Sequence, residues 1–122
     1  MKGRRREMPR EEFHRMLCAV FSVPSIHSEY GMAELMSQAY SQGDGLFRTP
    51  PWMRVLTRDL NDPFAWAGSG RSGGINVIDL ANVYSCSFLQ TQDFGKAYDD
   101  GTFRIEGRIT GSEIRGCNLL VQ

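Results

Sequence analysis

The hydrophobic pattern changes its period near residue 45, and this change constrains the fold of the chain more than any other feature. Before that point, apolar side chains recur at the 3.6-residue spacing of an amphipathic helix: Phe13, Met16, Leu17, Val20 and Phe21. After the turn-forming sequence Gly-Asp-Gly at 43–45, apolar residues occur in short runs between turns that contain glycine or proline. The pattern predicts an α+β fold with helices first and a small antiparallel sheet or partial barrel after them.

Two helices and a short extended segment are expected in residues 1–45. Pro9 and the acids that follow it suit a first helical turn, because the N–H that proline lacks would be unpaired there and negative charge favours the helix dipole. We expect the apolar stripe to face a core and Pro24 to end this helix. An extended link at 25–30 then leads to a second predicted helix at 33–40, which the glycines at 43–45 stop.

Residues 46–122 predict a β-rich segment. Runs at 52–57, 75–80, 87–89 and 102–106 have the composition of strands, and Asp-Asp-Gly at 99–101 predicts a hairpin turn. The glycine-rich stretch at 68–74 predicts a flexible connection. No helix is expected after it, so it is a poor candidate for a phosphate-binding loop.

The composition excludes several classes of protein. A chain of 122 residues accommodates one ordinary domain, and its 14 basic and 14 acidic side chains give a net charge of +0. It therefore lacks the basic excess typical of proteins that bind nucleic acid or anionic membranes. Its longest apolar run, at 16–21, is far shorter than the roughly 20 residues of a membrane span.

The three cysteines form no CxxC pair and are odd in number, which favours a reduced, cytoplasmic protein without a disulfide framework. Cys18 and Cys86 lie in an expected helix and an expected strand, where packing is the ordinary role of a cysteine. Cys117 instead follows Arg115 in a polar segment. A nearby guanidinium favours the thiolate, which is the nucleophilic form of cysteine. An idle exposed thiol is the alternative.

Other single residues carry only weak signals. Glu34 lies near the start of the second expected helix and Asp93 follows an expected strand, so a solvated first-turn carboxylate and a turn aspartate are their ordinary interpretations. His14 and His27 have no Cys, Asp or Glu at metal-ligand spacing, which favours surface or hydrogen-bonded histidines.

The order of several segments gives them a common interpretation. EYGMAEL at 29–35 resembles the YGxTE motif of adenylate-forming enzymes, TQDFG at 91–95 resembles their TGD motif, and DGTFRIEGR at 100–108 resembles their DG…GR segment. Further segments at 50–52, 78–82 and 107–118 are similar to the acyl-protein synthetase branch, the LuxE-type fatty-acid ligases. The resemblance covers essentially the whole chain, but only the C-terminal portion of the family's enzyme.

The resemblance implies an activity with two steps. ATP activates a fatty acid or another carboxylic acid as an acyl-adenylate with the help of magnesium, and the acyl group then passes to a cysteine and on to an acyl-CoA or aldehyde reductase. The family's phosphate loop and most of its acyl pocket lie upstream of the matched region. The resemblance therefore implies one partial domain, divided at 1–45 and 46–122, which is a fragment or one half of a split enzyme with a missing upstream half as partner.

Four residues are implied to bind the nucleotide. Tyr30 would pack against the adenine, and Gly31 would let the backbone approach the nucleotide closely. Asp93 would accept hydrogen bonds from both ribose hydroxyls, because a carboxylate offers two acceptor oxygens. Arg108 would reach the ribose or the phosphates with its donor fork.

Two further residues are implied in the chemistry, and one position departs from the family. Glu34 would hold the magnesium, and Cys117 would receive the acyl group. Ala33 stands where the family has a threonine that contacts the adenylate phosphate, and loss of one such donor lowers a rate by about 10²–10³. A catalytically silent nucleotide-binding or protein-interaction module is therefore the alternative function.

A third hypothesis, which assumes no homology, is a small α+β interaction domain. It would be favoured if Glu34 and Asp93 were fully buried, satisfied by backbone groups and directed toward no cleft.

Overall fold

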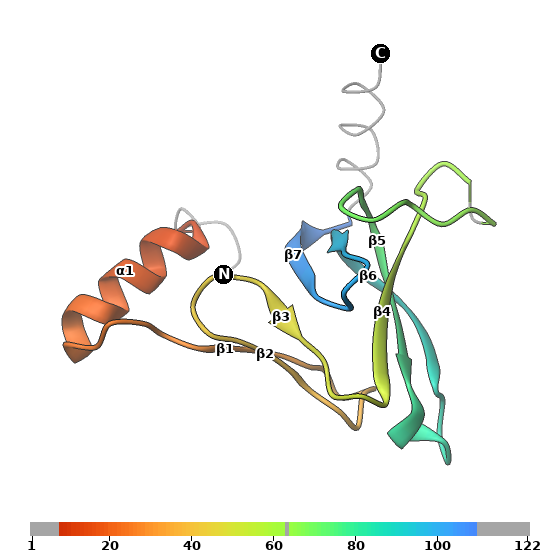
Figure 1. The fold of residues 1–122 in the computed structure, drawn as a ribbon, viewed down its shortest axis with the longest axis horizontal. Helices are drawn as coiled ribbons and strands as arrows, with labels where there is room; N and C mark the ends of the chain where they lie inside the picture. The colour runs from red at the N-terminus through yellow and green to blue at the C-terminus, as the bar shows by residue number, and fades with distance from the viewer. Residues whose placement is uncertain (1–7, 63, 110–122) are drawn as a thin grey trace, which may run out of the picture.

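A computed structural model describes residues 8–62 and 64–109 of the chain (Figure 1). In this part of the chain, helix α1 (Arg10–Phe21) precedes seven strands. The strands are β1 (Ser28–Tyr30), β2 (Ala39–Ser41), β3 (Phe47–Arg48), β4 (Met53–Arg58), β5 (Ser72–Asp79), β6 (Phe88–Ala97) and β7 (Phe103–Arg108). A short 3-10 helix, η1 (Leu80–Asn82), follows β5.

The strands form one open antiparallel sheet in the order β1-β2-β3-β7-β6-β5-β4. β4 to β7 follow one another as a meander, and β7 then pairs with β3 through Phe47 and Phe103. The antiparallel sheet expected from the sequence is confirmed. The pairing of β7 with β3 brings the end of the described chain next to the strands that follow α1 (Figure 1).

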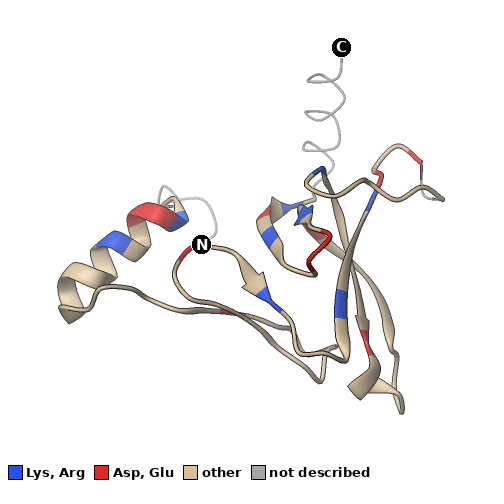
Figure 2. Cartoon of the chain, viewed as in Figure 1, with Lys and Arg blue, Asp and Glu red and all other residues tan. Residues whose placement is uncertain are grey.

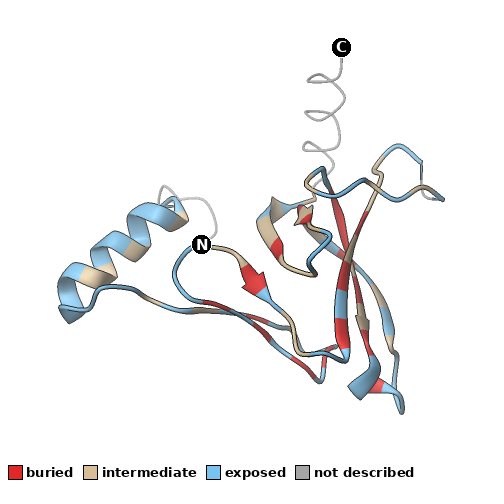
Figure 3. Ribbon diagram, viewed as in Figure 1, coloured by how far each residue is buried: buried red, intermediate tan, exposed pale blue. Residues whose placement is uncertain are grey.

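An aromatic cluster joins β1, β3 and β7 in the core. Phe103 is fully buried and stacks on Phe47 with ring centroids 5.3 Å apart. Tyr30 meets both rings edge-on, at 5.2 Å from Phe103 and 6.0 Å from Phe47. Figure 3 shows that most of the buried residues lie along the strands. The cluster fixes the end of β1, from which the predicted nucleotide-binding motif begins.

Helix α1 forms at the predicted residues, but its predicted packing is wrong. Pro9 occupies the N-cap, and Ser22 ends the helix in a left-handed conformation, with Val23 N–H donating to Cys18 O at 3.1 Å. None of its residues is buried, and Phe21 is 65% exposed. The residues of the helix that line a hollow against the sheet are others, namely Arg10, Glu11, His14, Arg15 and Cys18. Within the described residues, no helix has the length and apolar character needed to cross a bilayer.

The second predicted helix, at 33–40, is wrong. Turns follow β1, and the segment then enters β2 at Ala39. From residue 35 to residue 41, buried and exposed residues alternate, which is the period of an extended chain. The sequence concealed this period, because the inward Ser37 and Ser41 are polar whereas the outward Met36 and Tyr40 are apolar.

The glycine-rich stretch at 68–74 is also not a flexible connection throughout. Ser72, Gly73 and Gly74 belong to β5 and pair with β6. A Cβ on Gly73 would lie 2.3 Å from the carbonyl oxygen of Arg58, and one on Gly74 would lie 2.4 Å from its guanidinium carbon. These glycines therefore allow close packing of strands rather than flexibility.

The predicted hairpin turn at 99–101 is confirmed, with Tyr98 N–H donating to Thr102 O at 2.9 Å and Gly101 at a φ of 87°. Strand β6 is longer than predicted, so Asp93 lies within a strand and not in a turn. Cys86 is exposed in the loop before β6, where its thiol donates to Phe88 O at 3.0 Å, so its predicted packing role is wrong.

Candidate functional site

Five of the six predicted site residues line one hollow of about 530 Å³: Tyr30, Gly31, Glu34, Asp93 and Arg108. They come from the end of β1, the loop after it, the middle of β6 and the end of β7. Met32 and residues 89–92 complete the lining. Cys117, the sixth residue, lies outside the described residues.

Asp93 is the polar centre of this hollow. The Tyr30 hydroxyl donates to Asp93 Oδ2 at 2.7 Å, across 63 residues of sequence. Arg108 lies opposite Asp93 in the β6–β7 ladder, and its Nε is 3.6 Å from Asp93 Oδ1. The Asp93 side chain is 16% exposed and lines the hollow. One carboxylate oxygen is thus occupied by a phenol, while the other keeps acceptor capacity beside a cation.

Tyr30 acts as a neutral hydrogen-bond donor in this pair. Burial raises the pKa of its hydroxyl well above the usual value, and the hydrogen bond to Asp93 and the negative charge of that carboxylate raise the pKa further. The ring packs on the aromatic core, and the residue is also part of the lining of the hollow. Tyr30 therefore orients Asp93 from the core side.

Glu34 lies at the edge of the hollow on the loop between β1 and β2. The residue is exposed, and its carbonyl oxygen accepts a hydrogen bond of 2.7 Å from Asn82 Nδ2. Among residues 8–62 and 64–109, no group of three or more His, Cys, Asp or Glu side chains could enclose a metal. One accessible carboxylate fits a magnesium ion that takes its other ligands from phosphates and water.

Gly31 and Ala33 lie on the same loop, and both are exposed. A Cβ on Gly31 would come 3.1 Å from Gln38 Cγ, so the absence of a side chain lets the loop pack closely here. The side chain of Ala33 is a methyl group, which offers no hydrogen-bond donor.

A second aspartate, which the sequence analysis did not assign to the site, holds this loop from behind. Asp79 is fully buried at the end of β5. Its carboxylate accepts hydrogen bonds from Met36 N and Ser37 N at 3.0 and 2.8 Å, from Ser37 Oγ at 2.8 Å and from Ala81 N at 3.1 Å. The Trp52 indole N–H donates to Ser37 Oγ at 2.7 Å. Burial alone would raise the pKa of Asp79, but these hydrogen bonds outweigh it and hold the pKa below its ordinary value.

Asn82 is a second anchor of the same loop. Besides Glu34 O, its amide donates to Cys86 O at 2.9 Å. A signal for this network was present in the sequence, because an aspartate that ends the mostly apolar segment at 75–78 needs partners if the strand is buried. The sequence could not identify those partners, which lie some forty residues away.

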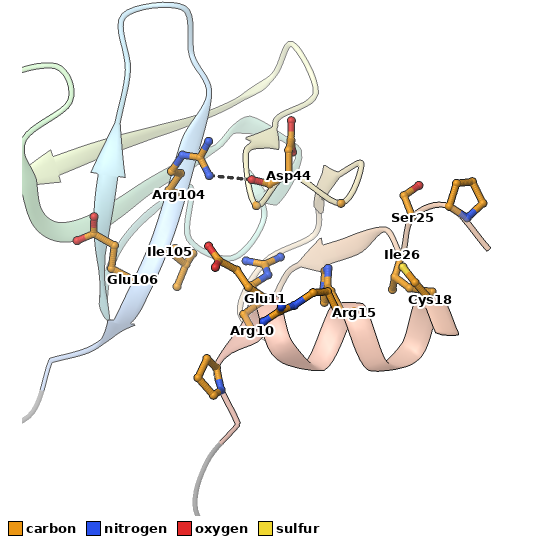
Figure 4. Close-up of a pocket in the computed structure, with 15 residues that line it drawn as sticks. Arg10, Glu11, Arg15, Cys18, Ser25, Ile26, Asp44, Arg104, Ile105 and Glu106 are labelled. Atoms are coloured by element: carbon orange, nitrogen blue, oxygen red, sulfur yellow. Dashed lines mark hydrogen bonds between the residues drawn. The ribbon is translucent and has the colours of Figure 1, made fainter. Parts of the chain in front are cut away.

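A larger hollow, of about 850 Å³, lies between α1 and the sheet but holds none of the predicted site residues (Figure 4). Its charged lining is mixed, with Arg10, Arg15 and Arg104 beside Glu11 and Glu106. Arg104 Nη1 is already bonded to the carbonyl oxygen of Asp44 at 2.8 Å. Acids and bases are also interspersed over the rest of the chain (Figure 2). The lining of this hollow is therefore not predominantly basic, as a binding site for a polyphosphate would be.

The surroundings of Glu34 and Asp93 argue against the third hypothesis, a small interaction domain in which both carboxylates would be buried. Glu34 is exposed, and Asp93 lines a hollow with acceptor capacity to spare. Neither carboxylate is fully buried and satisfied by backbone groups.

Comparison of the sequence with known protein families and with curated proteins gives no match. Solved structures do match. ATP-bound MatB from Rhodopseudomonas palustris has a TM-score of 0.60 at 20% identity, over 80% of this chain and 23% of its own. The luciferase-like enzyme of the mealworm Zophobas morio has a TM-score of 0.58 at 18% identity, over 84% of this chain and 30% of its own.

A third match is O-succinylbenzoate coenzyme A synthetase (MenE) from Bacillus subtilis in complex with AMP, with a TM-score of 0.54 at 18% identity. It covers 76% of this chain and 23% of its own. This chain thus spans about a quarter of the length of the structures it matches. Its described residues have the fold of one part of adenylate-forming enzymes.

Proposed function

We propose that this chain forms the nucleotide-binding wall of an ATP-dependent ligase that activates carboxylic acids as acyl-adenylates, of the acyl-protein synthetase type. One observation carries the proposal. Residues from three separate motifs, Glu34, Asp93 and Arg108, line a single hollow in a fold that resembles ATP-bound MatB and AMP-bound MenE.

The polar groups of the hollow are suited to a nucleoside monophosphate. Asp93 accepts the hydrogen bonds of the ribose hydroxyls, while Tyr30 keeps the carboxylate in place and contributes to the wall of the hollow that would meet the adenine. Arg108 is 76% exposed beside Asp93, so its guanidinium is free to turn toward the ribose or the phosphates.

Glu34 supplies the carboxylate oxygen for a magnesium ion. The metal, when bound, neutralises the charge that develops on the phosphate oxygens during the transfer. The Glu34 carboxylate is exposed at the edge of the hollow and forms no ion pair with any described residue, which leaves it available for this role.

The proposed reaction has two balanced steps. A fatty-acid carboxylate attacks the α-phosphorus of ATP, the bond between the α-phosphorus and its bridging oxygen breaks, and pyrophosphate leaves. The Cys117 thiolate then attacks the acyl carbonyl carbon, which forms a thioester and releases AMP. A reductase that consumes the thioester would be the partner.

Ala33 favours a second candidate, a module that binds nucleotide without catalysis. In place of a hydroxyl donor, this exposed position offers only a methyl group. Loss of a transition-state contact of this kind lowers the rate of adenylation more than the affinity for AMP.

Two measurements on the whole chain test the proposal. Calorimetric titration with AMP is expected to give saturable heats, and flat heats from the folded chain would contradict both candidates. When the upstream half that the resemblance implies is supplied, exchange of labelled pyrophosphate into ATP, dependent on added fatty acid, is expected for the ligase. AMP binding without exchange under these conditions supports the silent module. Cys117→Ser is expected to keep the exchange and lose the acyl label; a fully labelled variant would remove Cys117 from the mechanism.

A further inference from the structure

The loop that carries Glu34 is fastened to the sheet at a point that does not touch the hollow. Asp79 receives four hydrogen bonds, two of them from consecutive main-chain N–H groups at Met36 and Ser37. These groups lie 42 and 43 residues from Asp79 in the sequence. Asp79 thereby connects the end of β5 to the loop two residues beyond Glu34.

Asn82 fixes the same loop at Glu34 itself. Its side-chain amide holds Glu34 O at 2.7 Å and is only 6% exposed. The main chain of the loop is therefore held at Glu34 and again at residues 36–37. Trp52 covers the second anchor through its bond to Ser37 Oγ.

We infer that Asp79, together with Asn82, is a positioning residue that holds the Glu34 carboxylate at the edge of the hollow where it would meet a nucleotide-bound magnesium ion. The inference rests on the proposed function, in which Glu34 carries that ion. Asp79 and Asn82 are absent from the lining of the hollow, so they act through the main chain of the loop and not by contact with ligand.

The choice of a carboxylate at Asp79 supports this role. A buried carboxylate is costly unless its oxygens are satisfied, and an apolar side chain would end a buried strand at lower cost. The four donors that converge on Asp79 can be satisfied together only when residues 36–37 follow one course past the sheet. The network thus fixes the conformation of the loop as well as its attachment.

The test compares Asp79→Asn with the wild-type chain in two measurements. Hydrogen exchange is expected to show at least about 10-fold faster exchange of the Met36 and Ser37 amides, because Asn carries no charge and its NH₂ group must face other donors, either Met36 N and Ser37 N or Ala81 N. Calorimetric titrations are expected to show that the gain in ATP affinity caused by Mg²⁺ falls roughly 10-fold or more, as is typical when the support of a metal ligand is removed. AMP affinity, which needs no magnesium, is expected to stay within about 2-fold.

Two further variants keep the test decisive. If Asp79→Asn does not fold, Asn82→Ala, which releases Glu34 O, is expected to give the same selective loss of the magnesium effect. Asp100→Asn is the matched control, because Asp100 also accepts a backbone and a hydroxyl hydrogen bond, both from Thr102, but in the β6–β7 turn away from the loop. It is expected to leave both measurements unchanged.

The outcomes separate the two claims. Wild-type protein that binds no ATP with or without Mg²⁺ overturns the proposed function, and with it the role of Glu34. If the wild-type protein shows the magnesium effect and the variants show it too, the positioning role alone is overturned. The same holds if the Met36 and Ser37 amides stay protected in the variants. Loss of AMP and MgATP binding by equal factors also overturns it, because it indicates general damage to the hollow.

Discussion

Asp79 and Asp93 lie on neighbouring strands of the same sheet, yet their environments are opposite. Asp79 is completely buried and its two oxygens accept four hydrogen bonds from the protein. Asp93 accepts one short hydrogen bond, from Tyr30, and otherwise has an arginine nitrogen 3.6 Å away at the edge of a hollow. The same side chain is thus saturated in one place and left with free acceptor capacity in the other.

This difference assigns the two residues to different tasks. A carboxylate whose acceptor sites are filled by the protein has nothing to offer a ligand, so it stabilises one conformation of the chain. A partly satisfied carboxylate in a hollow costs stability unless something else completes it, and a ribose diol has the two donors that would do so. Exposure and hydrogen-bond partners together therefore distinguish Asp79, whose acceptor sites are filled by the protein, from Asp93, which we propose to bind the ligand.

The largest expected effect is on stability, in Asp79→Ala. This change leaves the buried Ser37 N–H and the partly buried N–H groups of Met36 and Ala81 without their acceptor, so we expect a loss of about 3 kcal/mol in the free energy of unfolding. Asp93→Ala removes one hydrogen bond at a wet edge and is expected to cost about 1 kcal/mol. Urea denaturation of both variants measures the difference. Equal losses would mean that the two aspartates do not differ in how many stabilising hydrogen bonds their carboxylates accept from the protein.

The next largest effect is on ligand affinity, in Asp93→Asn. The amide cannot accept at both positions, so AMP is expected to bind about 10-fold more weakly, which corresponds to about 1.4 kcal/mol. The free energy of unfolding is expected to change by less than about 1 kcal/mol, because one acceptor oxygen remains for Tyr30. Calorimetric titration is the measurement, with Asp100→Asn as control; unchanged AMP affinity in Asp93→Asn would remove Asp93 from the nucleotide site.

The same contrast explains how much of the structure could be predicted from the sequence. Helix α1 and the hairpin turn at 99–101 depend on local signals, namely periodicity, a proline in the first turn and a glycine with positive φ, and both are confirmed. The second helix was wrong because what decides the course of residues 33–40 is the buried Asp79, far away in the sequence. Local propensity did not contain that information.

For the candidate site, too, the sequence pointed to residues that lie in recognisable motifs but not to residues that act through distant contacts. Tyr30 and Asp93 were predicted from a resemblance to known motifs, and they lie together although 63 residues separate them. Asp79 and Asn82 were in a segment that also resembled the family, but a segment without an assigned role gives no reason to select them. Only the three-dimensional structure shows that their partners are the loop around Glu34.

A smaller effect is expected when acid removes only the charge of Asp79. The folded pKa of Asp79 lies below its usual value of 3.8, so its contribution to stability is present above that value and is lost as the pH falls toward the folded pKa. Urea midpoints measured from pH 6 down to about pH 3 are expected to decline less steeply in Asp79→Asn than in the wild-type chain. Asp44 and Asp100 also have lowered pKa values, so both proteins keep some acid sensitivity. Parallel curves would show that Asp79 is not held ionised by its four donors.

The smallest effect is expected in Tyr30→Phe, which changes Asp93 from its core side. The substitution keeps the ring that packs on Phe103 and removes only the 2.7 Å hydrogen bond, so the expected loss is about 1 kcal/mol in the free energy of unfolding. Because the pKa of Tyr30 is raised well above its usual value, absorbance at alkaline pH is expected to show the same tyrosine ionisation near pH 10 in both proteins. Loss of one of the chain's four tyrosines from that ionisation in the variant would show that Tyr30 titrates freely and does not hold Asp93. We expect the Tyr30 hydrogen bond to keep Asp93 in the orientation that would bind a ligand. AMP affinity is therefore expected to fall in Tyr30→Phe, but by less than in Asp93→Asn. The reason is that both acceptor oxygens of Asp93 remain in Tyr30→Phe and only their orientation is no longer fixed.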